Sequence, residues 1–276
     1  MKKIMTVLLM FLLSVSVLSG CGNSSAEKES NEKSSDNGIK TYVVAHSGSP
    51  KPFNYFDENN ERAGYEIELL KEVEKRLGNV HFKFETTEFP SLFAGLDAGK
   101  FDLIINNITD KPERREKYLF SSEDYFKNHT VLAMKEETVG INTIDDLQGK
   151  TVTASPGSAT ANFLEAYNEK NKSNPINVDY VEGDYTPNIL NVYNGRYMAC
   201  IYSESYLDVV EKEYGFHLKR VNIANENEIQ SPSAYILYRK DETELQQKID
   251  KVIKEMKADG SLSELCIKYF DKDHTK

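Results

Sequence analysis

The pattern of hydrophobic residues changes twice along this chain. Residues 4–17 form an almost unbroken apolar run behind Lys2 and Lys3. Residues 22–38 are almost entirely polar, and from Ile39 onward short apolar runs alternate with stretches in which apolar residues recur every three or four positions. The last pattern is typical of an α/β protein, in which short strands alternate with amphipathic helices.

The short apolar runs predict strands at 41–45, 81–86, 101–106, 131–135, 151–154, 178–181, 199–202, 218–221 and 234–238. Helical spacing predicts helices at 65–77 and 91–98, around Phe163, Leu190 and Leu207, at 242–258, and up to 270. Gly78 and Gly260 follow two of these helices and predict their ends. Ser261 and Glu264 predict a capping box for the last helix. So many short units favour two lobes over one large core.

The first apolar run is too short for a membrane span and has the length of a signal-peptide core. It ends at Leu18-Ser19-Gly20-Cys21, which resembles the bacterial lipobox, where small residues precede a cysteine that is lipidated. We therefore predict a lipoprotein signal peptide at 1–20, a lipid on Cys21, and a disordered tether at 21–38. An ordinary signal peptide with an incidental cysteine is the alternative. The anchored chain would lie on the extracytoplasmic face of the cell membrane.

The charge and the cysteines exclude several classes of function. The net charge of −10 argues against nucleic acid or anionic lipid as a partner. Cys200 and Cys266 are far apart and lack metal-ligand spacing, so we expect neither a zinc site nor a disulfide framework, but two buried thiols. We expect no cofactor.

Five blocks of sequence occur in a characteristic order and spacing. They are SPKPFNY at 49–55 with GYEIE at 64–68, GKFDLII at 99–105, PER at 112–114 with FS at 120–121, DLQGK at 146–150 leading to GS at 157–158, and KADGS at 257–261. Together they resemble the family 3 bacterial solute-binding proteins, the polar amino-acid receptors of ATP-binding-cassette (ABC) importers. The resemblance extends from about residue 41 to residue 270.

The resemblance implies a two-lobed, Venus-flytrap α/β fold, in which each lobe is a mixed sheet flanked by helices. Lobe 1 would comprise 39–129 and 232–276, and lobe 2 would comprise 130–231. The crossings near 128–130 and 231–234 would be the hinge, and a ligand that contacts both lobes would favour closure. The implied protein is a binding protein rather than an enzyme, and it is a monomer. Its implied partners are an amino acid and a complex of an ABC permease with its ATPase.

The resemblance also places Arg114 where this family has the arginine that binds the ligand carboxylate. A guanidinium suits this role because it donates two parallel hydrogen bonds. Thr109 would lie beside the same carboxylate, whereas we interpret Arg115 as a solvated helix charge. Ser158 and Ala159 lie at a strand-to-helix turn, where free N–H groups favour anions. Ser158 equally fits a plain N-cap, and the two roles are compatible.

The partner of the ligand ammonium group departs from the family pattern. Relatives usually have an aspartate after the strand that corresponds to 199–202, but this chain has Ser203 followed by Glu204. Ser203 could contribute its oxygen while Glu204 or a lobe 1 carbonyl supplies the charge, or the ammonium could be held differently. An acid at a helix N-terminus is an equally good interpretation of Glu204.

Other residues are candidates for the wall around the ligand side chain. Ser47 stands where relatives often have an aspartate, and Phe53 and Tyr55 follow it. We favour a core position for Phe53, and Tyr55 could contact a ligand or cover the lobe. Asn106 and Asn107 end a buried strand and suit a neutral polar side chain. Segment 106–121 also resembles the cystine or sulfur amino-acid receptors of the family, with a glutamine-like ligand as the competitor.

Two other functions stay open at this point. The same fold can carry an extracytoplasmic lyase or dehydratase, which needs a general acid or base. The five histidines show no catalytic spacing, and only His46 borders the predicted cleft, where a plain loop role is the simpler interpretation. The second possibility is a ligand-sensing lipoprotein that has no transporter.

Overall fold

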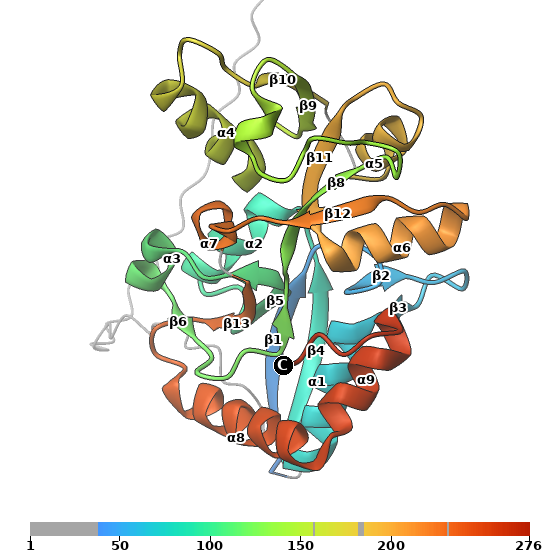
Figure 1. Cartoon of the computed structure of the whole chain (residues 1–276). Coiled ribbons are helices and arrows are strands. Elements are labelled where there is room, and N and C mark those ends of the chain that lie inside the picture. Colours follow the sequence, from blue (N-terminus) through green and yellow to red (C-terminus); the bar gives the residue numbers. More distant parts are fainter. Residues whose placement is uncertain (1–37, 157, 182–184, 231) are drawn as a thin grey trace, which may run out of the picture. The chain divides into compact units, whose positions relative to one another are not determined.

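The computed structural model describes residues 38–156, 158–181, 185–230 and 232–276, which form two mixed sheets flanked by helices (Figure 1). The predicted signal peptide, Cys21 and all but the last residue of the predicted tether lie outside the described residues. Within those ranges, no helix combines the length and the apolar character needed to cross a membrane.

The first sheet has six strands, ordered β4-β1-β5-β13-β6, with β7 also paired to β13. They are β1 (Lys40–His46), β4 (Val80–Thr86), β5 (Leu103–Thr109), β6 (Leu119–Phe120), β7 (Phe126–Lys127) and β13 (Ser233–Tyr238). The first three are parallel, and β13 runs antiparallel to β5, β6 and β7. The last strand of the chain therefore lies inside the first sheet.

Helices pack on both faces of this sheet. The core on one face combines strand residues with α1 (Tyr65–Leu77), α8 (Thr243–Asp259) and α9 (Ser261–Phe270). The other face packs against α2 (Phe89–Asp97). The short α3 (Pro112–Lys117) follows β5, and β2 (Tyr55–Phe56) with β3 (Arg62–Ala63) forms a separate hairpin.

The second sheet has five strands, ordered β10-β9-β11-β8-β12. They are β8 (Thr130–Met134), β9 (Thr151–Ala154), β10 (Asn177–Tyr180), β11 (Ala199–Ser203) and β12 (Lys219–Asn222). The helices of this part are η1 (Asp145–Leu147), α4 (Ala159–Lys170), α5 (Tyr185–Tyr193), α6 (Glu204–Tyr214) and α7 (Glu226–Ile229). One face packs against α4 and α7 and the other against α5 and α6, so both sheets are buried on two sides.

The chain passes between the two sheets twice, before β8 and before β13. The two crossings are joined directly, because the Asn128 backbone N–H donates to the Pro232 carbonyl. The C-terminal tail is attached at the same place, where the Lys127 N–H donates to the His274 carbonyl at 2.7 Å. These backbone contacts hold the crossing segments side by side.

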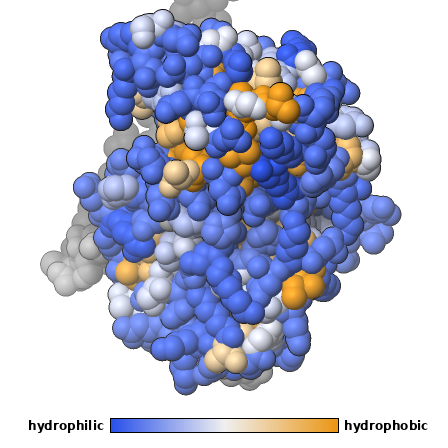
Figure 2. Space-filling view, in the orientation of Figure 1, coloured by the Kyte–Doolittle hydropathy of each residue, from blue (hydrophilic) through white to orange (hydrophobic). Residues whose placement is uncertain are grey.

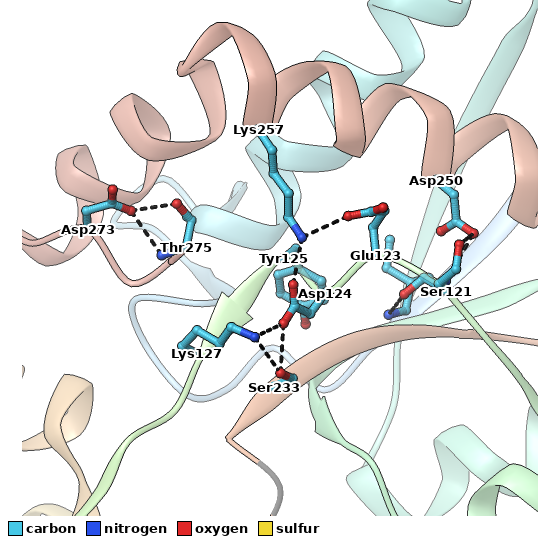
Figure 3. A network of polar contacts seen from close by, with 12 residues as sticks. Ser121, Glu123, Asp124, Tyr125, Lys127, Ser233, Asp250, Lys257, Asp273 and Thr275 are labelled. Carbon is cyan, nitrogen blue, oxygen red and sulfur yellow. Dashed lines mark hydrogen bonds and ion pairs between the residues drawn. The ribbon is translucent and has the colours of Figure 1, made fainter.

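A polar network supports the crossings from the side of the first sheet (Figure 3). The Asp124 carboxylate accepts hydrogen bonds from Ser233 Oγ and Lys257 Nζ, both at 2.7 Å, and from Lys127 Nζ. Burial tends to raise the pKa of Asp124, but the bonds from the two lysines outweigh burial and lower it. The network ties β7 to β13 and α8 next to both crossings.

Most predicted elements are present, with corrections at their ends. The strand predicted at 101–106 is β5 and starts two residues later, while α3 was not predicted. The predicted capping box is wrong, because Ser261 Oγ donates to Asp259 Oδ1 at 2.6 Å and no side chain caps α9. The predicted lobe boundaries stay a prediction.

The start of α1 is pressed against the loop before it. The Tyr65 N–H donates to the Pro52 carbonyl at 3.0 Å, and the Glu66 N–H donates to the Phe53 carbonyl at 2.9 Å. Gly64 makes this approach possible with a φ of 121°, and a Cβ there would overlap the Phe53 carbonyl. A glycine is therefore required at this position.

We expect Gly64→Ala to lower the free energy of unfolding by about 2–5 kcal/mol, from backbone strain and steric overlap together. Urea unfolding monitored by circular dichroism measures the change. Gly99→Ala is the matched control, since Gly99 has a φ of 70° but open space around the position of a Cβ. An equal loss in both variants would contradict the role of the Phe53 carbonyl.

Candidate functional site

The candidate site is built around a bulge near the end of β5. From Ile104 to Ile108, β5 advances four residues, whereas its partner β13 advances only two, from Leu237 to Tyr235. Asn107 lies inside this irregularity with a φ of 47°, in the left-handed region that asparagine tolerates better than most residues. The bulge removes the Asn107 N–H from regular pairing, so that this donor needs another acceptor.

Glu66 is that acceptor. Its side chain on α1 is completely buried, and its carboxylate accepts hydrogen bonds from the Asn107 N–H, the Tyr125 hydroxyl and the Asn54 side-chain amide, each at 2.5 Å. Burial raises the pKa of the Glu66 carboxyl to about 7, although these three hydrogen bonds act in the opposite direction. One buried carboxyl thus joins α1, β5, the residue before β7 and the loop before β2.

Asn106 and Asn107 point to different partners. Asn106 is 6% exposed, and its Oδ1 accepts from Ser47 N at 2.7 Å and from Ser47 Oγ at 2.8 Å. The amide of Asn107 exchanges hydrogen bonds with that of Asn128 at 2.7 and 3.1 Å, and also donates to the Tyr206 hydroxyl at 3.3 Å. The bulge therefore connects the loop after β1, the chain crossing and α6.

Two tyrosines from helices that pack on the second sheet lie in the same region. The rings of Tyr185 and Tyr206 stack with centroids 4.4 Å apart, and the Tyr206 ring meets Phe53 edge-on at 5.9 Å. The Tyr185 hydroxyl donates to the Lys51 carbonyl at 3.0 Å. Side chains from α5 and α6 therefore contact the loop that precedes β2.

Arg114 lies on α3, directly after β5. Its Nη1 donates to the Thr109 carbonyl at 3.0 Å, and its guanidinium lies 5.1 Å from the centre of the Phe93 ring. Burial lowers its pKa, and among the described residues no carboxylate lies within ion-pair distance of it. Arg115, in contrast, is exposed and holds Asp110 at 2.7 Å. In the described part of the chain, the half-buried guanidinium of Arg114 therefore has no carboxylate partner within ion-pair distance.

The candidates near the second sheet differ in their hydrogen bonds and burial. Ser158 is the N-cap of α4, since its Oγ accepts from Ala161 N at 3.1 Å, and Ala159 is the first residue of that helix. Ser203 is 3% exposed and its Oγ lies 3.1 Å from Ser205 Oγ.

The Glu204 carboxylate lies near the guanidinium of Arg220. Arg220 Nη1 lies 3.9 Å from its carboxylate, while Arg220 Nη2 pairs with Asp208 at 2.6 Å and Glu211 at 2.8 Å. The interpretation of Glu204 as an acid at a helix N-terminus matches this position, because it is the first residue of α6.

The two aromatic candidates, Phe53 and Tyr55, lie in different surroundings. Phe53 has no exposed surface and packs against Phe126 and Phe270, with ring centroids 4.8 and 4.9 Å away, so the core interpretation replaces its assignment as a ligand contact. Tyr55 lies on the β2–β3 hairpin, where Lys51 Nζ is 5.1 Å from its ring centre.

A cavity of about 440 Å³ opens beside the bulge. It is lined by Ser47, Ser49, Pro50, Glu88, Phe89, Asn106, Asn107 and Tyr206. Five of these, Ser49, Pro50, Glu88, Phe89 and Tyr206, were not predicted from the sequence as site residues. Phe89 is 40% exposed at the start of α2 and meets Phe93, the ring under Arg114, at 5.4 Å. The signal in the sequence that could have identified Phe89 is an aromatic residue directly before a proline at the start of a helix.

A second cavity, of about 400 Å³, lies between α4, η1 and the β12–α7 connection and contains none of the predicted residues. The hydrophobic surface in Figure 2 is concentrated over the half of the molecule with the five-stranded sheet, whereas the other half is mostly hydrophilic. The cavity at the β5 bulge brings three of the predicted binding residues together, namely Ser47, Asn106 and Asn107, whereas Thr109, Arg114 and the candidates of the second lobe do not line it.

The histidine and cysteine candidates for catalysis or metal binding are buried. His46 is completely buried, with Nδ1 3.1 Å from Gly48 N and Nε2 3.2 Å from Thr86 Oγ1, and burial lowers its pKa to about 4. Cys200 and Cys266 are buried free thiols, as expected. In the described part of the chain, no cluster of three or more His, Cys, Asp or Glu side chains could hold a metal ion.

Comparison with known proteins identifies clear relatives. Residues 42–272 match the bacterial extracellular solute-binding proteins, family 3. The L-cystine-binding protein TcyA of Bacillus subtilis is 32% identical over 285 aligned residues, which cover 100% of both chains. TcyJ of the same organism, also an L-cystine-binding protein, is 28% identical over 97% of this chain and 96% of its own.

A similar solved structure comes from work on glutathione import by GshT and the cystine ABC importer TcyBC of Streptococcus mutans. It is 29% identical, covers 86% of this chain and 97% of its own, and has a TM-score of 0.74. The two-lobed α/β fold that the sequence predicted is thus confirmed.

Glu66 predicts a pH dependence of stability. Its pKa is raised by folding from 4.5 to about 7, so its favourable contribution is complete below about pH 4.5 and is lost as the pH rises through about 7. Relative to Glu66→Gln, the free energy of unfolding of the wild type should fall by about 3 kcal/mol over this interval. Urea unfolding at a series of pH values measures the difference.

Glu68→Gln is the control on the same helix. The pKa of Glu68 is lowered despite partial burial, by its contacts with Lys268 and Tyr269, so its removal should change the pH dependence only below about pH 4.5. Parallel pH profiles of the wild type and Glu66→Gln between pH 4.5 and 7 would contradict the titration of Glu66.

Proposed function

This chain belongs to the bacterial extracellular solute-binding proteins of family 3, and we propose that it captures a polar amino acid and delivers it to an ABC importer. The observation that carries the proposal is the half-buried guanidinium of Arg114, which has no carboxylate partner among the described residues. A desolvated cation of this kind is most favourable when an anion completes it, and the ligand carboxylate would be that anion.

The geometry at the end of β5 supports a grip on this carboxylate. Arg114 already contacts the Thr109 carbonyl, which fixes its guanidinium at the strand end while other N–H groups stay available to a ligand. The first turn of α4, with Ser158 and Ala159, would offer N–H groups from the second lobe. A carboxylate bound by both lobes would favour the closed form over the open one.

The ammonium group of the ligand needs an acceptor other than Glu204. Glu204 does not line the cavity at the bulge and lies 3.9 Å from Arg220, and Ser203 offers at most one hydroxyl oxygen. A carbonyl of the first lobe, near the bulge at Asn107, is the acceptor that best fits the remaining possibilities. The ammonium would then be held mainly by oxygen dipoles, which accept hydrogen bonds without a full charge.

Cystine is the ligand that we favour, with glutamine next. The walls near Ser47 and Asn106 present hydroxyl and amide groups, and Phe89 adds an aromatic face that can pack against sulfur. The names of TcyA and TcyJ as L-cystine-binding proteins support the same choice. An ABC permease and ATPase complex would receive the ligand from a monomeric protein.

Arg114→Ala should weaken binding of the cognate amino acid by about 3–5 kcal/mol, or roughly a hundred- to several-thousand-fold. The thermal midpoint of the empty protein should change little, because Arg114 forms no ion pair there among the described residues. Calorimetric titration with cystine and glutamine gives the affinity. The control is Arg115→Ala, which removes an exposed arginine that pairs with Asp110. Wild-type affinity in Arg114→Ala would contradict the assignment.

The anchor is a separate proposal, because it rests on residues 1–38 of the sequence. A lipid on Cys21 and the polar segment behind it would keep the domain beside the membrane on its extracytoplasmic face. Cys21→Ser should shift the protein from the membrane fraction to the soluble extracytoplasmic fraction, measured by immunoblotting of fractionated cells. Retention of this variant in the membrane fraction would exclude a lipid on Cys21 as the anchor.

A further inference from the structure

One carboxylate in the cavity beside the bulge has no described partner. Glu88 lines this cavity together with Ser47 and Asn106. It is the N-cap residue of α2, yet its side chain makes no capping hydrogen bond. Among the described residues, no hydrogen bond or ion pair to its carboxylate is formed. The charge of Glu88 is therefore available to a ligand in the cavity.

The cavity lies to one side of the proposed carboxylate site. Neither Thr109 nor Arg114 lines it, whereas Asn106 does. Thr109 follows Asn106 by three residues along β5, which corresponds to roughly 10 Å of extended strand, less the shortening at the bulge. The α-ammonium group is bonded to the same carbon as the carboxylate and stays near Arg114. Glu88 therefore faces the far end of the ligand.

The groups around Glu88 call for a hydrogen-bond donor with a positive charge. Asn106 Oδ1 already accepts two hydrogen bonds from Ser47 and holds that residue in place, so that the acceptors left on this side of the cavity are the Ser47 hydroxyl oxygen and the Glu88 carboxylate. An ammonium group supplies three donors and no acceptor, which suits such a set. Closure around an unpaired carboxylate would be costly without a cation.

We propose that Glu88, with Ser47 and Asn106, forms a distal subsite for a second amino group on the ligand; this rests on the proposed function above. A disulfide-linked diamino acid carries such a group, because its second α-amino group is on a Cα atom about 4.4–6.8 Å from the first. A basic amino acid presents the same distal cation without a second carboxylate. Phe89 and Tyr206 line the same cavity, where their rings can contact a disulfide or an aliphatic chain.

The test combines a variant with a matched pair of ligands. Wild type and Glu88→Gln are titrated by calorimetry with L-cystine and with the mixed disulfide of cysteine and 3-mercaptopropionate, which lacks only the distal amino group. Glu88→Gln should weaken binding of cystine about 10- to 100-fold and change the affinity for the mixed disulfide far less. L-Lysine and L-arginine are titrated in parallel, and tighter binding of these identifies a basic amino acid as the source of the distal cation.

Glu85→Gln is the matched control for charge. Glu85 lies on β4 three residues before Glu88, and its carboxylate pairs at the surface with Lys83 at 3.1 Å and Lys100 at 3.6 Å. This variant should bind every ligand as the wild type does, so that a general effect of lost negative charge would be detected.

Three results would overturn the subsite. They are equal losses for cystine and the mixed disulfide in Glu88→Gln, unchanged affinity for both, and a wild type that binds glutamine but no ligand with a distal amino group. In each of these cases Arg114→Ala still weakens binding of the amino acid that the wild type binds, and the proposed function stands. A wild type that binds none of these amino acids would contradict the proposed function itself.

Discussion

The buried carboxylate of Glu66 lies where α1, β5 and the loop before β2 meet, and the geometry of the site depends on it. A bulge that takes an N–H out of a sheet is stable only if another acceptor receives it, and Glu66 receives the Asn107 N–H at 2.5 Å. The bulge in turn aims Asn106 at Ser47 and Asn107 at Asn128. A single buried acid, raised in pKa by its burial, thus sets the relation between the binding loop and the chain crossing.

The regular elements could be predicted because each carries its own local pattern. Helix α8 repeats buried residues at helical spacing from Leu245 to Met256, and β13 is a short run of buried residues. The short α3 has no buried residue, so it leaves no hydrophobic period to detect. The bulge at Asn107 is invisible in the sequence, because it is set by the pairing of β5 with a strand more than a hundred residues away.

Candidate residues could be proposed from the sequence where a residue type suits one chemical task. They were harder to propose where the packing of distant elements determines whether a side chain lines the cavity. Arg114 and Arg115 are neighbours of the same type, and family spacing separated them before the structure gave Arg115 its partner Asp110. Phe53 was also a candidate ligand contact, but the core position that the sequence analysis favoured is the one observed, because rings distant in sequence bury it completely. Glu88 and Phe89 were missed because their place in the cavity depends on how α2 packs beside the bulge.

The half-buried charge of Arg114 makes the empty protein the less favourable state. Arg114 is desolvated without a described counter-ion at one end, and Glu88 faces a cavity at the other, with neutral amide and hydroxyl groups between them. A ligand carboxylate relieves the desolvation of Arg114, and a distal cation would supply the exposed Glu88 with a partner once the lobes close over it. Capture becomes closure only if the same ligand also gains contacts in the closed form, and the first turn of α4 would supply them through its free N–H groups. Selectivity and closure would then depend on different groups of the ligand, namely its distal amine and its carboxylate.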